Sequence, residues 1–185
     1  MGHGFLYQQN SLRDAVVAGL HLNIFNNHAD RVRMANIAQT VNVLQAMVLT
    51  RDDEMILTPT YHVFEMYTPH HDALLLPIQL DAGTYEYDEY STPAVSASAS
   101  TKDGQIFITL TNVDPNEART VRTEIRGGDV SSVSGRVLTA DAFNAHNTFE
   151  SPDVVRPVPF DGATLSGSTL TVELPAKSVV ALTLR

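Results

Sequence analysis

The chain contains no cysteine among its 185 residues. It therefore has no disulfide framework and no thiolate metal site, so its fold has to depend on a hydrophobic core. An apolar content of 43% is sufficient for such a core and argues against intrinsic disorder. The lack of cysteine is also compatible with a reducing environment, and we expect a cytoplasmic protein.

Basic residues are scarce as well: 12 Lys and Arg stand against 21 Asp and Glu, for a net charge of −9. Nucleic-acid binding requires clustered basic side chains, and here they are scattered. No apolar run reaches the roughly 18–20 residues that cross a bilayer. Residues 1–4 lack the basic and apolar regions of a signal peptide. The sequence predicts neither a nucleic-acid nor a membrane partner.

The composition changes near residue 73, which predicts two domains, 1–72 and 73–185. The first holds most of the methionines and histidines. The second is rich in Val, Thr, Ser, Gly and Pro and contains repeated short alternating runs. With 185 residues the chain is long enough for two small domains.

The first segment follows the order helix, short strand, helix. Ser11 is a good N-cap for a helix that ends near Asn26-Asn27. Residues 31–37 are short and mostly apolar, as in a buried parallel strand, and Tyr61–Tyr67 predicts a further helix. One strand between helices cannot bury both faces of a sheet, so this segment is half of a larger unit.

The second segment predicts antiparallel β structure. The Asp103-Gly104 pair between two alternating runs is a strong hairpin signal, because both positions tolerate positive φ. Seven or eight short strands at this spacing indicate a β-sandwich or jelly roll. The expected strands cover residues 75–81, 95–101, 105–112, 120–126, 130–139, 169–174 and 178–184.

Two amides, Gln39 and Asn42, stand where the short apolar run 31–37 ends. An amide can donate to and accept from sugar hydroxyls, and in a barrel of alternating strands and helices the strand end is where substrate binds. The alternative is that Gln39 is an ordinary polar loop residue. The residues alone leave both possibilities open.

Other polar clusters have structural explanations. His21 and His28 share a helical face, but no third ligand recurs at a metal-site interval, so we predict no metal and no cofactor. The run His70-His71-Asp72 is expected to be a linker packed between domains. Glu65 is expected to have a structural or surface role, because it has no visible catalytic partner.

A tyrosine-rich acidic stretch, residues 85–90, occurs early in the second segment. Aromatic rings can stack on sugars, so a carbohydrate-binding face is conceivable. Tyr85 and Tyr87 share one strand face and are expected instead to cover the core or the domain junction.

Four segments resemble the C-terminal end of the family 51 glycoside hydrolases, which are α-L-arabinofuranosidases. They are residues 5–15 (FLYQQNSLRDA), 23–44, 55–67 (MILTPTYHVFEMY) and 174–184 (LPAKSVVALTL). The resemblance is specific over residues 5–67 and loose over the sandwich.

The resemblance implies a partial (β/α)8 catalytic barrel in residues 1–72, followed by a β-sandwich accessory domain. It also implies retaining hydrolysis of terminal arabinofuranosides by two glutamates about 5 Å apart. Both glutamates would precede Phe5, so the chain alone would contain no catalytic residue. Gln39 would correspond to the family glutamine that hydrogen-bonds the arabinose ring. An arabinofuranosyl oligosaccharide or polysaccharide substrate and a homo-oligomer are implied as partners.

Two alternatives from other classes remain: a stand-alone carbohydrate-binding module and an oligomerisation module. Residues 5–67 argue against both, because neither needs a helix–strand–amide segment. Without the rest of a barrel, the apolar faces of residues 12–25 and 32–37 lack their partners. We therefore expect residues 5–72 to rearrange, to pair between chains, or to dock onto the sandwich.

Overall fold

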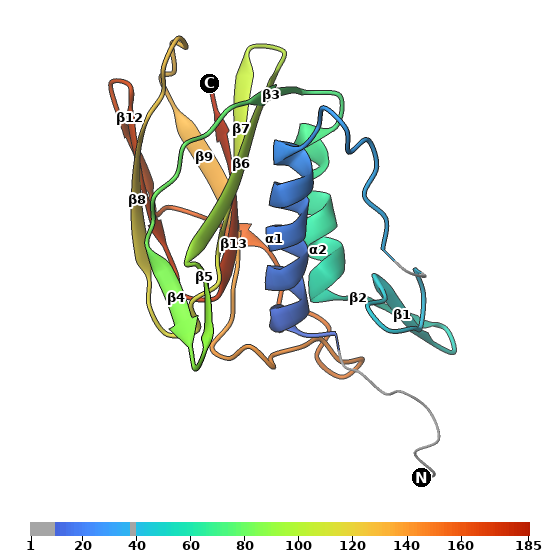
Figure 1. Ribbon diagram of the computed structural model, residues 1–185. Helices are drawn as coiled ribbons and strands as arrows, with labels where there is room; N and C mark the ends of the chain where they lie inside the picture. The colour runs from blue at the N-terminus through green and yellow to red at the C-terminus, as the bar shows by residue number, and fades with distance from the viewer. Residues whose placement is uncertain (1–9, 38–39) are drawn as a thin grey trace.

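Three layers make up the computed structural model, which describes residues 10–37 and 40–185 (Figure 1). Two helices, α1 and α2, cover one face of a six-stranded antiparallel sheet. A three-stranded antiparallel sheet covers the other face. The expected mainly β, antiparallel architecture is confirmed.

The helical layer has well-formed N-termini. Helix α1 spans Leu12–Asn27, and its N-cap Ser11 donates its backbone N–H to Asp14 Oδ2 at 2.8 Å, as expected for a capping box. Helix α2 spans Pro59–Met66, and the Thr58 hydroxyl accepts from the N–H of Tyr61 at 3.3 Å. A short 3-10 helix, η1 (Thr68–His70), follows. Both predicted helices are confirmed.

The two sheets form the sandwich. The six-stranded sheet has the order β10 (Val158–Pro159), β9 (Val133–Leu138), β13 (Ser178–Leu184), β7 (Gln105–Asn112), β6 (Val95–Lys102) and β3 (Leu74–Leu76). The three-stranded sheet has the order β11 (Ala163–Ser166), β12 (Thr169–Leu174) and β8 (Arg119–Glu124). Two hairpins stand apart, β1 (Val48–Arg51) with β2 (Glu54–Leu57), and β4 (Thr84–Tyr87) with β5 (Tyr90–Pro93).

Strand β6 shows why the sandwich and the helices share one sheet. Its run of alternating serine and alanine, residues 96–100, places Ala97 and Ala99 in the core between the two sheets. The serines face the other way, and Ser98 and Ser100 are buried under the helical layer. Small side chains on this face let a helix approach closely.

Helix α1 uses that close approach. A Cβ added at Gly19 would lie 2.7 Å from Thr111 Oγ1 and 3.1 Å from Val179 Cγ2, so only glycine fits there. A second apolar cluster joins the helices to the sheet and includes Leu12, Val63, Leu138 and Val179, each fully buried. Helices α1 and α2 thus dock onto the sandwich, which is one of the three arrangements expected for residues 5–72.

The strand boundaries agree with the prediction for some strands of the sandwich and differ for others. The strands β7, β12 and β13 match their predicted bounds, and β3, β8 and β9 are shorter than predicted. The prediction of a strand at residues 31–37 is wrong for this chain: residues 32–37 carry no regular secondary structure. A strand requires a neighbouring strand for its hydrogen bonds, and within the described residues none lies beside this segment.

Two hairpins, β1–β2 and β4–β5, were not predicted from the sequence. Asp52 and Asp53 form the turn between β1 and β2, and neither of these strands is among the predicted ones. The expectation that Tyr85 and Tyr87 cover the core or the domain junction is wrong for Tyr87, because its side chain is 72% exposed on the β4–β5 hairpin. The period of two correctly indicates a strand but does not reveal that this strand projects from the sandwich.

Candidate functional site

The residue predicted to contact substrate, Gln39, lies outside the residues that the structure describes. The same holds for Ala38, so the described residues nearest to Gln39 are Ile37 and Thr40. The candidate site is therefore built from the segment that leads into residue 39 and from the loop that follows it, residues 40–47, called here the amide loop.

Backbone hydrogen bonds close the amide loop. The carbonyl of Thr40 accepts from the N–H groups of Met47 and Val48, each at 3.0 Å, and Asn42 donates to the carbonyl of Val48 at 3.1 Å. Asn42 and Gln45 adopt left-handed conformations, with φ of 55° and 59°. The loop therefore has a defined conformation next to Gln39.

Buried polar side chains attach the amide loop to both helices. The carbonyl of Ala46 accepts from Thr58 Oγ1 at 2.7 Å and from Asn10 Nδ2 at 3.2 Å. Thr60 donates to Asn10 Oδ1 at 3.0 Å. Gln45 also donates to the carboxylate of Asp14 at the start of α1. Because Asn10, Thr58 and Thr60 are buried, these bonds hold the loop against the helices.

The second amide of the predicted pair has a structural role. Asn42 Nδ2 donates to Thr50 Oγ1 at 2.8 Å, and Asn42 Oδ1 accepts from the Thr50 N–H at 2.8 Å. Both ends of this amide are occupied by strand β1. Asn42 therefore positions the loop, and Gln39 remains the candidate for substrate contact.

A cavity of about 600 Å³ lies beside the segment that leads into Gln39. It is bordered by the end of α1, residues 32–35, α2 and η1. Its lining combines apolar side chains with polar ones: Leu22, Phe25, Asn26, Ala29, Val32, Arg33, Met34, Ala35, Phe64, Tyr67, His70, His71, Asp72 and Ala73.

A buried polar seam at the cavity wall joins α1 to the sheet. Asn23 is fully buried, and its Oδ1 accepts from Thr109 Oγ1 at 2.8 Å and from Ser98 Oγ at 2.9 Å. Its Nδ2 donates to the carbonyl of Ser96 at 3.1 Å. The Tyr67 hydroxyl lies 2.9 Å from the same Asn23 Oδ1. Burial raises the pKa of the Tyr67 hydroxyl to about 12, so it stays protonated and can donate.

His70 extends this seam towards the solvent. Its Nδ1 lies 2.7 Å from Ser100 Oγ, and its Nε2 lies 3.2 Å from Thr109 Oγ1. Burial, with a smaller contribution from the nearby His71, lowers the pKa of His70 to about 4. The expectation that this run packs at the junction of the two segments is met at His70, where a neutral imidazole bridges η1 to strands β6 and β7.

The depressed pKa of His70 predicts an acid-sensitive stability. The imidazole stabilises the fold fully above its unfolded pKa of about 6.5, and this contribution is lost as the pH falls towards 4. We expect protonation of His70 to lower the free energy of unfolding by about 2 kcal/mol as the pH falls from 8 to 5. Urea denaturation of the chain and of His70→Gln at both pH values measures this difference.

The matched control for that experiment is His21→Gln. His21 is exposed on α1, where Nδ1 lies 2.8 Å from the carbonyl of Val17. This variant should keep the pH dependence of the parent chain. An unchanged pH dependence in His70→Gln would contradict the assignment to His70.

The remaining polar residues of the first segment make contacts that stabilise the fold. Glu65 forms an ion pair with Arg136 on the surface, as its expected surface role requires. His28 is the C-cap of α1, and Arg33 contacts the carbonyl of Asp30 at 3.4 Å. Across residues 10–37 and 40–185, no three His, Cys, Asp or Glu side chains are grouped to hold a metal ion.

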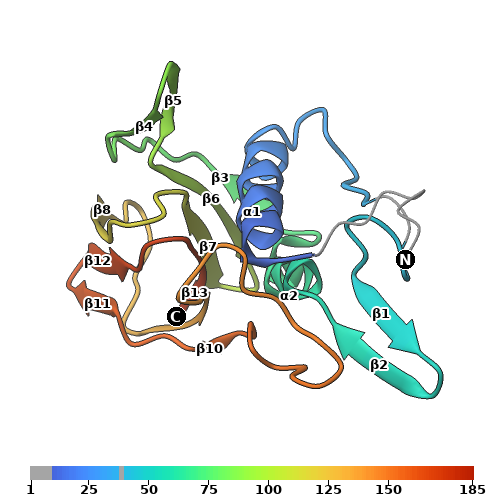
Figure 2. The same ribbon diagram turned by 90° about the horizontal axis from the view of Figure 1, so that it is seen from below.

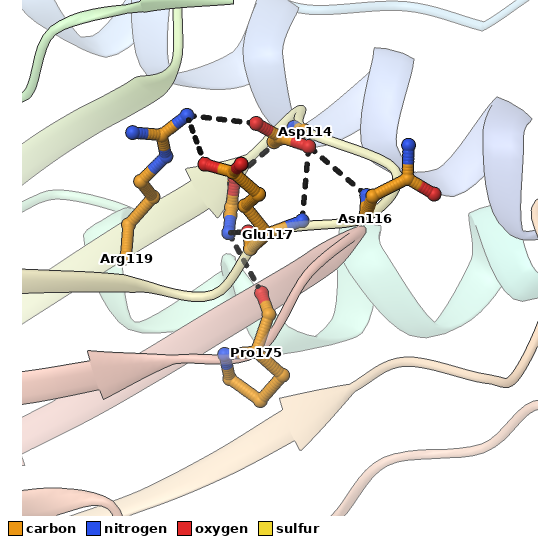
Figure 3. A network of polar contacts seen from close by, with 6 residues as sticks. Asp114, Asn116, Glu117, Arg119 and Pro175 are labelled. Atoms are coloured by element: carbon orange, nitrogen blue, oxygen red, sulfur yellow. Dashed lines mark hydrogen bonds and ion pairs between the residues drawn. The ribbon is translucent and has the colours of Figure 1, made fainter.

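One further polar network closes the turn before β8 (Figure 3). The Asp114 carboxylate accepts from the N–H groups of Asn116 and Glu117 and from Arg119 at 2.8 Å. Burial opposes ionisation of Asp114, but these donors outweigh it and hold the pKa below its usual range. Asn112 connects this turn to Pro175, whose carbonyl accepts from its amide at 2.9 Å.

None of the helices in the described part of the chain is long and apolar enough to cross a membrane.

The sandwich with its helical layer recurs in solved structures of glycoside hydrolases, where it forms one part of a longer chain. The crystal structure of the family 51 arabinofuranosidase from Xanthomonas axonopodis pv. citri matches this chain with a TM-score of 0.95 and 52% identity. The match covers 100% of this chain and 38% of that one.

The chain belongs to the family described as alpha-L-arabinofuranosidase C-terminal domain, whose model matches residues 2–178. An intracellular exo-alpha-L-arabinofuranosidase from Bacteroides ovatus is 49% identical over 98% of this chain and 36% of its own length. An intracellular exo-alpha-(1->5)-L-arabinofuranosidase from Streptomyces lividans is 28% identical over 89% of this chain and 25% of its own length. The chain thus spans about a third of these relatives or less.

Proposed function

We propose that this chain forms the C-terminal portion of an intracellular, exo-acting α-L-arabinofuranosidase. The complete enzyme would remove terminal arabinofuranosyl groups from arabinan, arabinoxylan or their oligosaccharides. The single observation that carries this proposal is the 49% identity to the Bacteroides ovatus enzyme over 98% of the chain. The aligned region includes both the helical layer and the sandwich.

In this proposal residues 1–72 complete a (β/α)8 barrel and residues 73–185 form the accessory sandwich. The segment 32–37 would become the last barrel strand once a neighbouring strand supplies its hydrogen-bond partners. Two glutamates of the preceding part of the barrel would perform the retaining hydrolysis. The exposed side chains of Arg33 and Met34 at the cavity are consistent with a segment that packs against further chain.

Gln39 would contact the arabinose ring from the end of that strand. The amide loop supports this role, because it is held by buried bonds from Asn10 and Thr58 directly after the site. A side chain that selects a sugar has to be supported by a fixed backbone, since a loose site loses the geometry of its hydrogen bonds.

Replacement of Gln39 by alanine in the complete enzyme tests the site. We expect kcat/KM for p-nitrophenyl α-L-arabinofuranoside to fall by about 10–100-fold, because one or two hydrogen bonds to the sugar are lost. Thr40→Ala is the control, since Thr40 is exposed and its structural bonds use the backbone. A Gln39→Ala enzyme with unchanged kcat/KM would exclude the proposed contact.

Hydrolysis of p-nitrophenyl α-L-arabinofuranoside also tests whether the catalytic carboxylates lie outside this chain. The present chain alone is expected to give no hydrolysis above background, because the proposed carboxylates lie outside it. Hydrolysis by the purified chain would refute that assignment.

We also propose that the complete enzyme is a homo-oligomer. Val17 and Ile24 leave an apolar stripe on the outer face of α1, with 46% and 44% of their surfaces exposed. Stripes of this kind are usually covered in an assembly or by further chain. Light scattering on the complete enzyme measures the mass, and a monomer would exclude the oligomer.

A further inference from the structure

The β4–β5 hairpin projects from the sandwich on the side away from the helical layer (Figure 2). Its backbone is a regular antiparallel ladder that pairs Thr84 with Pro93 and Tyr87 with Tyr90. At its base Ala94 donates to the carbonyl of Gly83 at 3.0 Å. The hairpin is thus an ordered arm whose two faces are reached from solvent.

The two faces of the arm differ in chemistry. Directly paired residues point to the same face, so Tyr87 and Tyr90 share a face with the pair Tyr85 and Thr92. We call this the tyrosine face. The opposite face carries the pairs Glu86–Ser91 and Thr84–Pro93. The tyrosine face therefore presents only aromatic rings and hydroxyl groups.

The exposure of the rings makes this face unusual. Tyr87 and Tyr90 keep 72% and 70% of their surfaces in solvent, although they lie side by side. Tyrosine offers a large flat surface with a polar tip and few rotatable bonds, which makes it a common contact residue in binding sites. Two exposed rings do not contribute to the hydrophobic core, so their pairing on the hairpin indicates a contact with a partner.

The charge pattern narrows the choice of partner. The acidic residues Glu86, Asp88 and Glu89 flank the tyrosine face, and residues 84–93 contain no Lys or Arg. These carboxylates repel nucleic acids, anionic membranes and acidic polysaccharides. A basic protein would be attracted to the acidic turn and the opposite face, where the carboxylates lie. The uncharged tyrosine face instead suits a neutral sugar chain, whose ring faces are apolar and whose edges carry hydroxyl groups.

We propose that the tyrosine face binds neutral polysaccharide, and that it acts as a second contact for the polymer away from the catalytic barrel. The choice of arabinan as polymer rests on the proposed function. Tyr87 and Tyr90 stack on sugar rings, and the hydroxyl groups of Tyr85 and Thr92 hydrogen-bond their edges. A contact of this kind raises the local concentration of a polymer at the enzyme without altering the chemical step.

Affinity electrophoresis of the present chain in gels that contain soluble linear arabinan tests this proposal. The chain is expected to be retarded, and the double variant Tyr87→Ala/Tyr90→Ala should bind about tenfold more weakly, because two stacking contacts are lost. Glu86→Gln, on the opposite face of the same hairpin, is the matched control and should be retarded like the parent. Gels with polygalacturonate, an acidic polymer, should show no retardation.

Three results would overturn the proposal. They are an unretarded parent chain, equal retardation of the double variant, and a lower molecular mass of the double variant in light scattering. The last would assign the tyrosine face to contacts between copies of the chain. Thermal unfolding of each variant establishes that the fold is intact.

Failure of polysaccharide binding can be distinguished from failure of the proposed arabinofuranosidase function. In the complete enzyme the double variant should hydrolyse p-nitrophenyl α-L-arabinofuranoside at the parent rate and lose activity only on polymer. A complete enzyme without activity on the small substrate would refute the proposed function and leave the gel result as it stands.

Discussion

Replacement of Asn23 by leucine is expected to lower the free energy of unfolding by about 3–5 kcal/mol. The leucine has the same number of side-chain heavy atoms and a similar branched outline, but it removes the acceptor shared by Ser98, Thr109 and Tyr67. It also leaves the carbonyl of Ser96 without its amide donor. Each buried polar group that loses its partner costs about 1–3 kcal/mol, and relaxation of the hydroxyl groups recovers part of the sum. Urea denaturation monitored by circular dichroism measures the loss.

Asn27→Leu on the same helix is the control for this substitution. Asn27 is exposed and makes one bond, from Nδ2 to the carbonyl of Ala97 at 2.9 Å. We expect a loss below about 1 kcal/mol there. Similar losses at both positions would contradict the view that the polar seam specifies how α1 sits on the sheet.

Removal of residues 1–72 is expected to leave a chain that does not fold as a stable monomer. The cut follows the predicted domain boundary, yet it uncovers the outer face of the six-stranded sheet. Leu138, Val155 and Val179, all fully buried in the helical cluster, would become exposed. Burial of each is worth about 1.5–3 kcal/mol, so their combined loss approaches the total stability of an ordinary domain. Light scattering and thermal unfolding of the shortened chain measure the outcome.

A second shortened chain makes that result interpretable. It carries Leu138→Thr and Val179→Thr, which make the uncovered face polar, and it should associate less than the first. If the unmodified segment 73–185 melts as a monomer at the temperature of the complete chain, the sandwich is an independent domain, as the composition predicts. Association of the unmodified segment would instead make the helical layer part of one folding unit with the sheet.

The candidate site could be predicted only in part. The resemblance to the arabinofuranosidases points to Gln39, and amides at the end of an apolar run point to the same loop. The role of Asn42 could not be assigned from sequence, because Asn42 bonds to Thr50 in strand β1, which belongs to a hairpin that was not predicted. The anchoring of Ala46 by Asn10 joins residues 36 positions apart. Contacts at such separations leave no local pattern in a single sequence.

The sequence by itself determined the local elements of this protein. The capping box at Ser11 and the alternation in β7, β12 and β13 predicted their positions, because helix caps and one-sided burial impose short-range patterns. Only the tertiary structure decided which side of β6 meets the helices, since its serines hydrogen-bond to α1 residues more than 70 positions away. It also decided that Tyr87 and Tyr90 face solvent. A period of two tells that two faces exist, and only packing against distant residues decides what each face contacts.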